Sequence, residues 1–191
     1  MKKRSWLVAA LALFASGCGY NRIQTLDETA ASAQSQIEVQ LQRRADLIPN
    51  LVATVKGYAQ HEEEVFNTVA EARSRLLNAV QSKDPEQMAN ADQQMTGALG
   101  RLLAISEAYP NLKADENFLK LQDELTGTEN RVAVARSDYN DAVRTYNAYI
   151  RTFPAVLTAK MFSSKPRKYF QATEQAQTAV PKVDFSKPDS K

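Results

Sequence analysis

The chain has 191 residues, of which 43% are apolar and 24% charged, and this balance favours a packed core over global disorder. The formal net charge is +2, and it falls to −1 if the N-terminal leader is removed, because the leader carries the three cations Lys2, Lys3 and Arg4 and no acid. A charge this close to zero gives no electrostatic basis for binding nucleic acid, so no nucleic-acid partner is expected.

Residues 1–17 have the layout of a cleaved secretory signal peptide, with a basic start, an apolar run from Trp6 to Ala15 and small residues after it. Cys18 follows directly, is the only cysteine, and stands where bacterial lipoproteins are acylated. We therefore predict a lipidated N-terminus at residues 18–20, attached to a membrane of the bacterial cell envelope by acyl chains such as palmitate. Two alternatives stay open: free secretion, since Ala15-x-Gly17 also suits an ordinary signal peptidase, and an uncleaved anchor, although that run is shorter than a span of about 20 residues.

Residues 21–44 are predicted to form the first helix, because apolar residues recur at three- and four-residue steps. Pro49 then lacks an amide hydrogen and is suited to the first position of a new helix, so we expect a tight apolar corner before it. In that geometry Arg43, Arg44 and Asp46 are interaction or register residues at the corner, with Asp46 capping the next helix and Arg44 the last carbonyls of the first. The competing geometry is one continuous helix kinked at Pro49.

Residues 49–81 are predicted to form the second helix, whose apolar seam contains the charged residues Glu62 and Arg73. They lie three turns apart on one face and are too distant to pair with each other, so each needs a partner from another helix. Candidate partners on the last helix are Arg131, Asp138 and Asp141. We interpret Glu62 and Arg73 as residues that fix the register of the helices.

Asp84-Pro85-Glu86 is a strong helix start, with an N-cap, a first-turn proline and a first-turn acid. The third helix is expected to run from there to Tyr109, where Pro110 stops it. The fourth shows the most regular pattern, with apolar or small residues alternating at three- and four-residue steps over residues 118–153. Its tyrosine stripe, which includes Tyr139, is expected to be core and interface.

The expected fold is all-α: an antiparallel up-down four-helix bundle over residues 21–160, with long helices and a partly disordered C-terminal tail over residues 161–191. The basic and aromatic stretch at residues 165–170 is expected to be solvated. Contact with anionic lipid is the alternative for this stretch, but it has fewer clustered cations than lipid binding usually requires.

Known catalytic and metal-binding patterns are missing from the sequence. The single histidine, His61, has no second histidine four residues later, so a zinc-protease helix is excluded, and a di-iron bundle would need two such motifs. No glycine-rich phosphate loop or serine elbow is present. We therefore expect no catalytic residue, no metal site, no cofactor and no enzymatic activity. One alternative stays open, a carboxylate-only metal site around Glu62 to Glu64.

Many segments of the mature chain, in order, resemble the LemA family. They are residues 40–52, 55–62, 72–73, 102–110, 116–118, 121–125, 128–131, 139–143, 146–147, 153–154 and 183–185. The resemblance implies a helical bundle with an N-terminal membrane attachment. Two departures are that many members keep an uncleaved transmembrane segment, and that Met161-Phe162-Ser163-Ser164 replaces a phenylalanine- and glycine-rich stretch.

The resemblance leaves the biochemical role open. We expect a non-enzymatic, membrane-anchored envelope lipoprotein that acts as a scaffold or adaptor, bound to the membrane through Cys18 and to unidentified envelope proteins. One alternative is a self-assembling, homo-oligomeric coat that organises membrane, since family relatives are linked to membrane compartments in magnetic bacteria. Another is a helical bundle that binds a small ligand or a metal.

Overall fold

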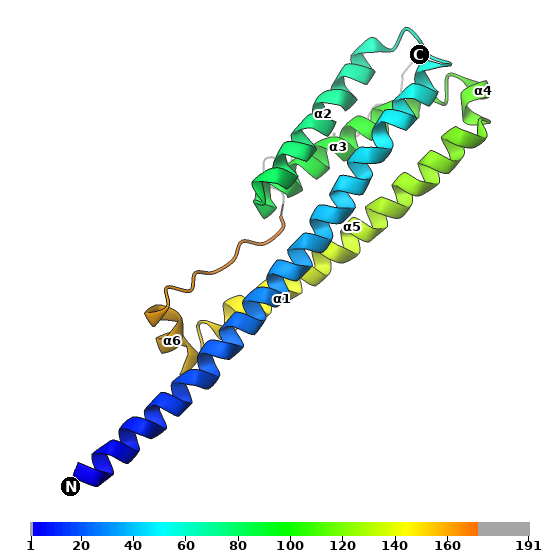
Figure 1. Cartoon of the computed structure of the whole chain (residues 1–191). Helices are drawn as coiled ribbons and strands as arrows, with labels where there is room; N and C mark the ends of the chain where they lie inside the picture. Colours follow the sequence, from blue (N-terminus) through cyan, green and yellow to red (C-terminus); the bar gives the residue numbers. More distant parts are fainter. Residues whose placement is uncertain (1, 172–191) are drawn as a thin grey trace, which may run out of the picture.

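The computed structural model describes the backbone of residues 2–171 and the side chains of residues 19–171. All regular structure in this part of the chain is helical, which confirms the predicted all-α class (Figure 1). The helices are α1 (Lys2–Lys56), α2 (Glu63–Ser82), α3 (Pro85–Ile105), α4 (Pro110–Lys113), α5 (Glu116–Tyr149) and α6 (Ala155–Met161). None of these helices contains a stretch that is long and apolar enough to cross a membrane.

The predicted corner at Pro49 is wrong, because α1 runs through this residue without interruption to Lys56. A proline inside a helix leaves the carbonyl four residues earlier without its donor, which here is the carbonyl of Ala45. Arg73 on α2 supplies a replacement, since its Nε donates to the Ala45 oxygen over 2.8 Å. Ile48 and Leu51 on either side are fully buried, so core packing also stabilises the helix at this site. The alternative of a helix that continues through Pro49 is correct at this residue, but the helix ends at Lys56 and does not join the segment that follows.

The chain reverses after residue 56 instead, so the predicted helix over residues 49–81 is divided in two. The amide of Gly57 donates to the carbonyls of Ala53 and Thr54, and the next turn closes with Ala59 bonded to Val55. Ala59 is buried, and the hydroxyl of Tyr58 donates to Asp115 at the start of α5 over 2.9 Å. The turn is therefore fixed to the neighbouring helix by specific contacts.

Local signals place the remaining boundaries. The Asp84 carboxylate accepts hydrogen bonds from the amides of Glu86 and Gln87, which confirms the predicted start of α3. Helix α3 ends at Ile105, four residues before the predicted end. Pro110 begins the short α4 rather than only stopping the preceding helix, and Asp115 caps α5 by accepting from the amide of Phe118.

Helices α1, α2, α3 and α5 all contribute to the main core and alternate in direction (Figure 1). The α2–α3 hairpin covers only one end of the long antiparallel pair α1 and α5. At the other end α6 packs against α1, and a second core forms from Ile23, Leu26, Tyr146, Ile150 and Ala159. Residues 21–160, for which an antiparallel four-helix bundle was expected, therefore form a rod whose two ends are built from different helices.

The C-terminal segment from residue 164 to residue 171 lies along this rod as an extended chain (Figure 1). It runs back from α6 toward the α2–α3 hairpin, and Phe170 near its end is buried in the main core. The prediction that residues 165–170 are solvated is correct for Lys165, Pro166, Lys168 and Tyr169, which are exposed, and wrong for Phe170, which is buried. The disorder predicted beyond this point falls on residues 172–191, outside the described part of the chain.

Candidate functional site: the extended strap and the α1–α5 face

Two tyrosine–asparagine pairs on α5 hold the extended segment, which we call the strap (residues 164–171). The hydroxyl of Tyr139 donates to the carbonyl of Lys168 over 2.8 Å, and that of Tyr146 donates to the carbonyl of Lys165 over 3.2 Å. Burial of these rings raises the pKa of both tyrosines, so both stay protonated and keep donating at neutral pH.

The two asparagines bind the strap in the same way, each through both hydrogen-bonding groups of one residue's backbone. Asn140 accepts from the amide of Phe170 over 2.9 Å and donates to its carbonyl over 3.3 Å. Asn147 makes the equivalent pair with Arg167, at 2.8 Å and 2.9 Å. These bonds replace the partners that a neighbouring strand would otherwise supply to an extended chain.

The repeat distances of the two partners match. Seven helical residues separate Asn140 from Asn147, a rise of about 10.5 Å. Three extended residues separate Arg167 from Phe170, which span about 10 Å. The two asparagines therefore bind an extended backbone that runs antiparallel to α5, at matching intervals. Because they contact backbone groups, these bonds depend little on the side chains of the strap.

Charged side chains fix the strap laterally. Arg167 pairs with Asp27 on α1 over 2.7 Å, and Lys168 pairs with Asp84 over 2.9 Å and with Glu86 over 3.6 Å. The hydrogen bond from Lys168, helped by the capping amides, lowers the pKa of Asp84. The strap thus connects α1, α3 and α5.

A groove of about 530 Å³ follows the α1–α5 seam, and its lining residues come from these two helices and not from α2 or α3. Its α1 wall includes Gln36 and Gln40, and its α5 wall includes Arg131 and Val134. Arg131 donates to Gln40 across the seam over 3.2 Å, and Val134 is 62% exposed. The groove combines amide, charged and apolar chemistry without the enclosure of a small-molecule pocket.

Arg44 forms a buried polar cluster between α1, α3 and α5. Its guanidinium contacts Asp92 at 2.6 Å, Thr96 at 3.0 Å and Glu129 at 3.9 Å, while its own Nε has no partner among the described residues. Burial raises the pKa of Asp92 even though Arg44 opposes the shift. Arg44 therefore joins three helices rather than capping a helix end.

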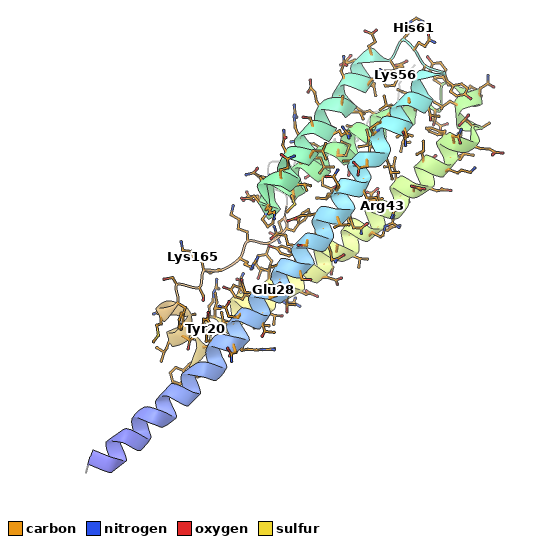
Figure 2. The ribbon with its side chains drawn as sticks, in the orientation of Figure 1. Tyr20, Glu28, Arg43, Lys56, His61 and Lys165 are labelled. Atoms are coloured by element: carbon orange, nitrogen blue, oxygen red, sulfur yellow. The ribbon has the colours of Figure 1, made fainter. Side chains whose placement is uncertain are left out.

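The other residues singled out at the supposed corner lie on the outer surface of α1. Arg43 and Asp46 are both exposed. Figure 2 shows Arg43 about midway along the rod. Asp46 accepts from Gln42 over 2.9 Å, one turn away on the same helix. The predicted capping roles of Arg44 and Asp46 are therefore wrong, because the helix does not end there.

Glu62 and Arg73 also differ from expectation in their partners. Arg73 does bond to another helix, but to the Ala45 carbonyl rather than to Asp138 or Asp141. Glu62 precedes α2 at its N-cap without a capping side-chain bond, next to the exposed His61 at the distal turn (Figure 2). Cys18 lies in α1, and its side chain is outside the described residues. Among the side chains described, no group of three or more potential ligands is placed to hold a metal.

Sequence reasoning missed the strap and its asparagines. The available signal was the dipeptide Tyr-Asn, repeated at 139–140 and at 146–147, one heptad apart on a helix that is otherwise charged outside its core face. Asp92 was missed too, because nothing in its local sequence distinguishes it from other surface acids.

A family model described as the LemA family matches residues 33–185, most of the chain and all of the strap. The chain belongs to the LemA family. Among named relatives of this LemA-family protein, Magnetosome protein MamQ 2 of Paramagnetospirillum magneticum is 27% identical, and MamQ of Magnetospirillum gryphiswaldense is 26% identical. Each match covers 84% of this chain and 68% of the relative. Protein LemA of Metamycoplasma hominis is 26% identical over 75% of this chain and 64% of its own length.

Proposed function

We propose that this LemA-family protein is a membrane-attached envelope scaffold that presents the α1–α5 face to partner proteins and catalyses no reaction. The observation that carries the proposal is the groove along the α1–α5 seam, which is lined by these two helices alone and is not covered by the α2–α3 hairpin. A rigid two-helix face of this kind suits a partner helix, which binds by laying one side into a groove between helices.

The chemistry of the groove supports a protein partner. Val134 offers an apolar anchor, and Gln36, Gln40 and Arg131 offer hydrogen bonds around it. An apolar centre with a polar rim is the usual composition of a protein–protein interface. The flat opening between the helices would leave most of a small ligand exposed to solvent.

Membrane attachment in this proposal is through acyl chains on Cys18, in a bacterial cell envelope. The support is the sequence before it, Ala15-Ser16-Gly17, after a basic and apolar leader. Two or more acyl chains give stable anchoring, since each buried methylene contributes about 0.8 kcal/mol.

The test is site-specific photo-crosslinking in intact cells that produce the protein. A photoreactive residue at position 134 should yield a discrete adduct with an envelope protein, and the same residue at position 119 should not. Leu119 is the matched control, because it is an exposed apolar residue on α5 that does not line the groove. Equal adducts at both positions, or none at position 134, would overturn the proposal.

The similarity to magnetosome proteins favours a second candidate, a self-assembling coat in which copies of this chain bind one another. The same experiment separates the two candidates, because assembly gives an adduct of twice the chain mass at position 134. Mass spectrometry of that adduct should then contain peptides of this chain alone.

A further inference from the structure

Four large apolar side chains around α6 are exposed together at one end of the rod. They are Phe153 (81% exposed), Leu157 (59%), Met161 (75%) and Phe162 (54%). The opposite side of α6 is buried, since Ala155 and Ala159 face the body of the protein. Leu157 and Met161 are one helical turn apart, so they share the outward face. We call these four side chains the foot.

The foot lies in a stretch of one charge sign. Residues 142–171 contain no acid and six cations. Three of these cations have acidic partners: Arg144, Arg167 and Lys168. The other three, Arg151, Lys160 and Lys165, are exposed and take part in none of the ion pairs of the described residues. Apolar groups flanked by free cations are the composition of a surface that binds an anionic membrane.

The position of the foot along the rod also supports contact with a membrane. Phe162 contacts Tyr20 with ring centroids 4.5 Å apart, and Thr158 lies against Gly19. Tyr20 and Lys165 both lie at this end, where the first part of α1 leaves the body of the protein (Figure 2). The foot is therefore next to Cys18 and to the apolar run before it, whichever of the two holds the protein to a membrane.

We propose that the foot is a lipid-contacting surface, in which α6 lies in the interface of an anionic bilayer with its outward face among the acyl chains and its cations at the headgroups. This inference rests on the membrane attachment proposed above, and it adds an orientation to it. A tether at Cys18 alone leaves the rod free to swivel, whereas a second contact at α6 fixes which side of the rod faces the membrane.

The test uses tryptophan fluorescence in the full-length protein reconstituted into vesicles. Trp6 is the only tryptophan, so Trp6→Phe gives a silent background. Met161→Trp then places the only tryptophan in the foot, and Val134→Trp places it instead in the α1–α5 groove. Both positions are exposed, so neither substitution disturbs the core. Vesicles contain phosphatidylcholine with or without phosphatidylglycerol, and some carry bromine on the acyl chains as a quencher.

We expect bromine to reduce the Met161→Trp signal at least twofold on anionic vesicles and to leave the Val134→Trp signal unchanged. Leu157→Gln in the reporter background should abolish the quenching. In the same Met161→Trp protein, Lys160→Glu with Lys165→Glu should remove the preference for anionic vesicles. The control pair Arg101→Glu with Lys120→Glu, at exposed cations outside the foot, should leave that preference unchanged.

Flotation of the same samples distinguishes the two proposals. Protein that floats with vesicles but shows no quenching at position 161 overturns the foot and leaves membrane attachment standing. Protein that does not float overturns both. Equal quenching at positions 134 and 161 also overturns the foot, because it means that the whole rod lies flat on the bilayer.

Discussion

The Arg44 guanidinium is buried almost completely, and Asp92 is its nearest countercharge. Removing one member of a buried pair leaves an uncompensated charge, which usually costs about 3–5 kcal/mol. We expect Asp92→Ala to lower the free energy of unfolding by about 3 kcal/mol in urea titrations. Replacing both partners, as in Arg44→Met with Asp92→Leu, should recover most of that loss. A single variant as stable as wild type would show that Glu129 suffices to compensate Arg44.

Arg73 and Pro49 are coupled through the carbonyl of Ala45, because Arg73 donates to its oxygen and Pro49 lacks the amide that would normally do so. Arg73→Met leaves the Ala45 oxygen without a donor, and a lost hydrogen bond of this kind costs about 1 kcal/mol. Pro49→Ala restores the helical amide that bonds to the same oxygen. The cost of Arg73→Met should therefore shrink in the Pro49→Ala background, as measured by a double-mutant cycle. Strictly additive losses would mean that Arg73 acts through other contacts.

Tyr139 combines a buried ring with a hydroxyl that holds the strap, and the two contributions separate in different variants. Its burial confirms the predicted core role. Tyr139→Ala deletes the ring and should cost about 3 kcal/mol, whereas Tyr139→Phe removes only the bond to Lys168 and should cost about 1 kcal/mol. Thermal melts would measure both, and similar losses for the two variants would place the energy in the hydroxyl rather than in packing.

At the scale of elements, the strap is held to α5 by side chains that can be removed singly. Asn147→Ala deletes both bonds to the backbone of Arg167. Hydrogen exchange at the Arg167 amide should speed up at least tenfold, with little change in the α2–α3 hairpin. Asn78→Ala, at an exposed position of α2, serves as the control. Unchanged exchange at residue 167 would mean that the ion pairs alone hold the strap.

Asp84 caps α3 and also pairs with Lys168 of the strap, so protonation of its carboxylate at low pH should weaken both interactions. Its pKa is lowered in the folded protein, chiefly by the bond from Lys168. A lowered acid pKa gives stability that is present above the ordinary value of 3.8 and is lost as the pH falls through the folded value. Asp84→Asn should therefore lower the melting temperature at pH 7 and have a smaller effect below pH 3.8. An equal difference at both pH values would contradict the ionic role.

Local and non-local signals explain which elements the sequence predicted. Asp84-Pro85-Glu86 carries its own cap and first turn, so the start of α3 was correct. Pro49 misled the prediction because its compensation comes from Arg73, on another helix. The strap was missed for the same reason, since Asn140 and Asn147 bond to residues 20–30 positions away. No local sequence pattern predicts the pairing of Arg44 with Asp92 or the docking of residues 164–171.

For the whole molecule, the first question is what holds it to a membrane. Cys18→Ala removes the residue that we expect to be acylated. The variant should leave the membrane fraction after a high-salt wash once its leader is processed, whereas wild type should remain there. Retention of the processed variant would contradict lipidation at this residue. Fractionation followed by mass determination of the mature N-terminus measures both properties.

The unbroken course of α1 has a mechanical consequence. From Gly19 to Lys56 one helix spans about 57 Å, and Figure 2 places Tyr20 at the start of this span and Lys56 and His61 at its far end. With a hinge at Pro49 the two ends would turn independently, but a continuous helix acts as a lever. A tilt of about 10° at the end near Cys18 would move the tip near His61 by about 10 Å. Small changes in tilt at one end would thus be amplified into large displacements of the distal turn.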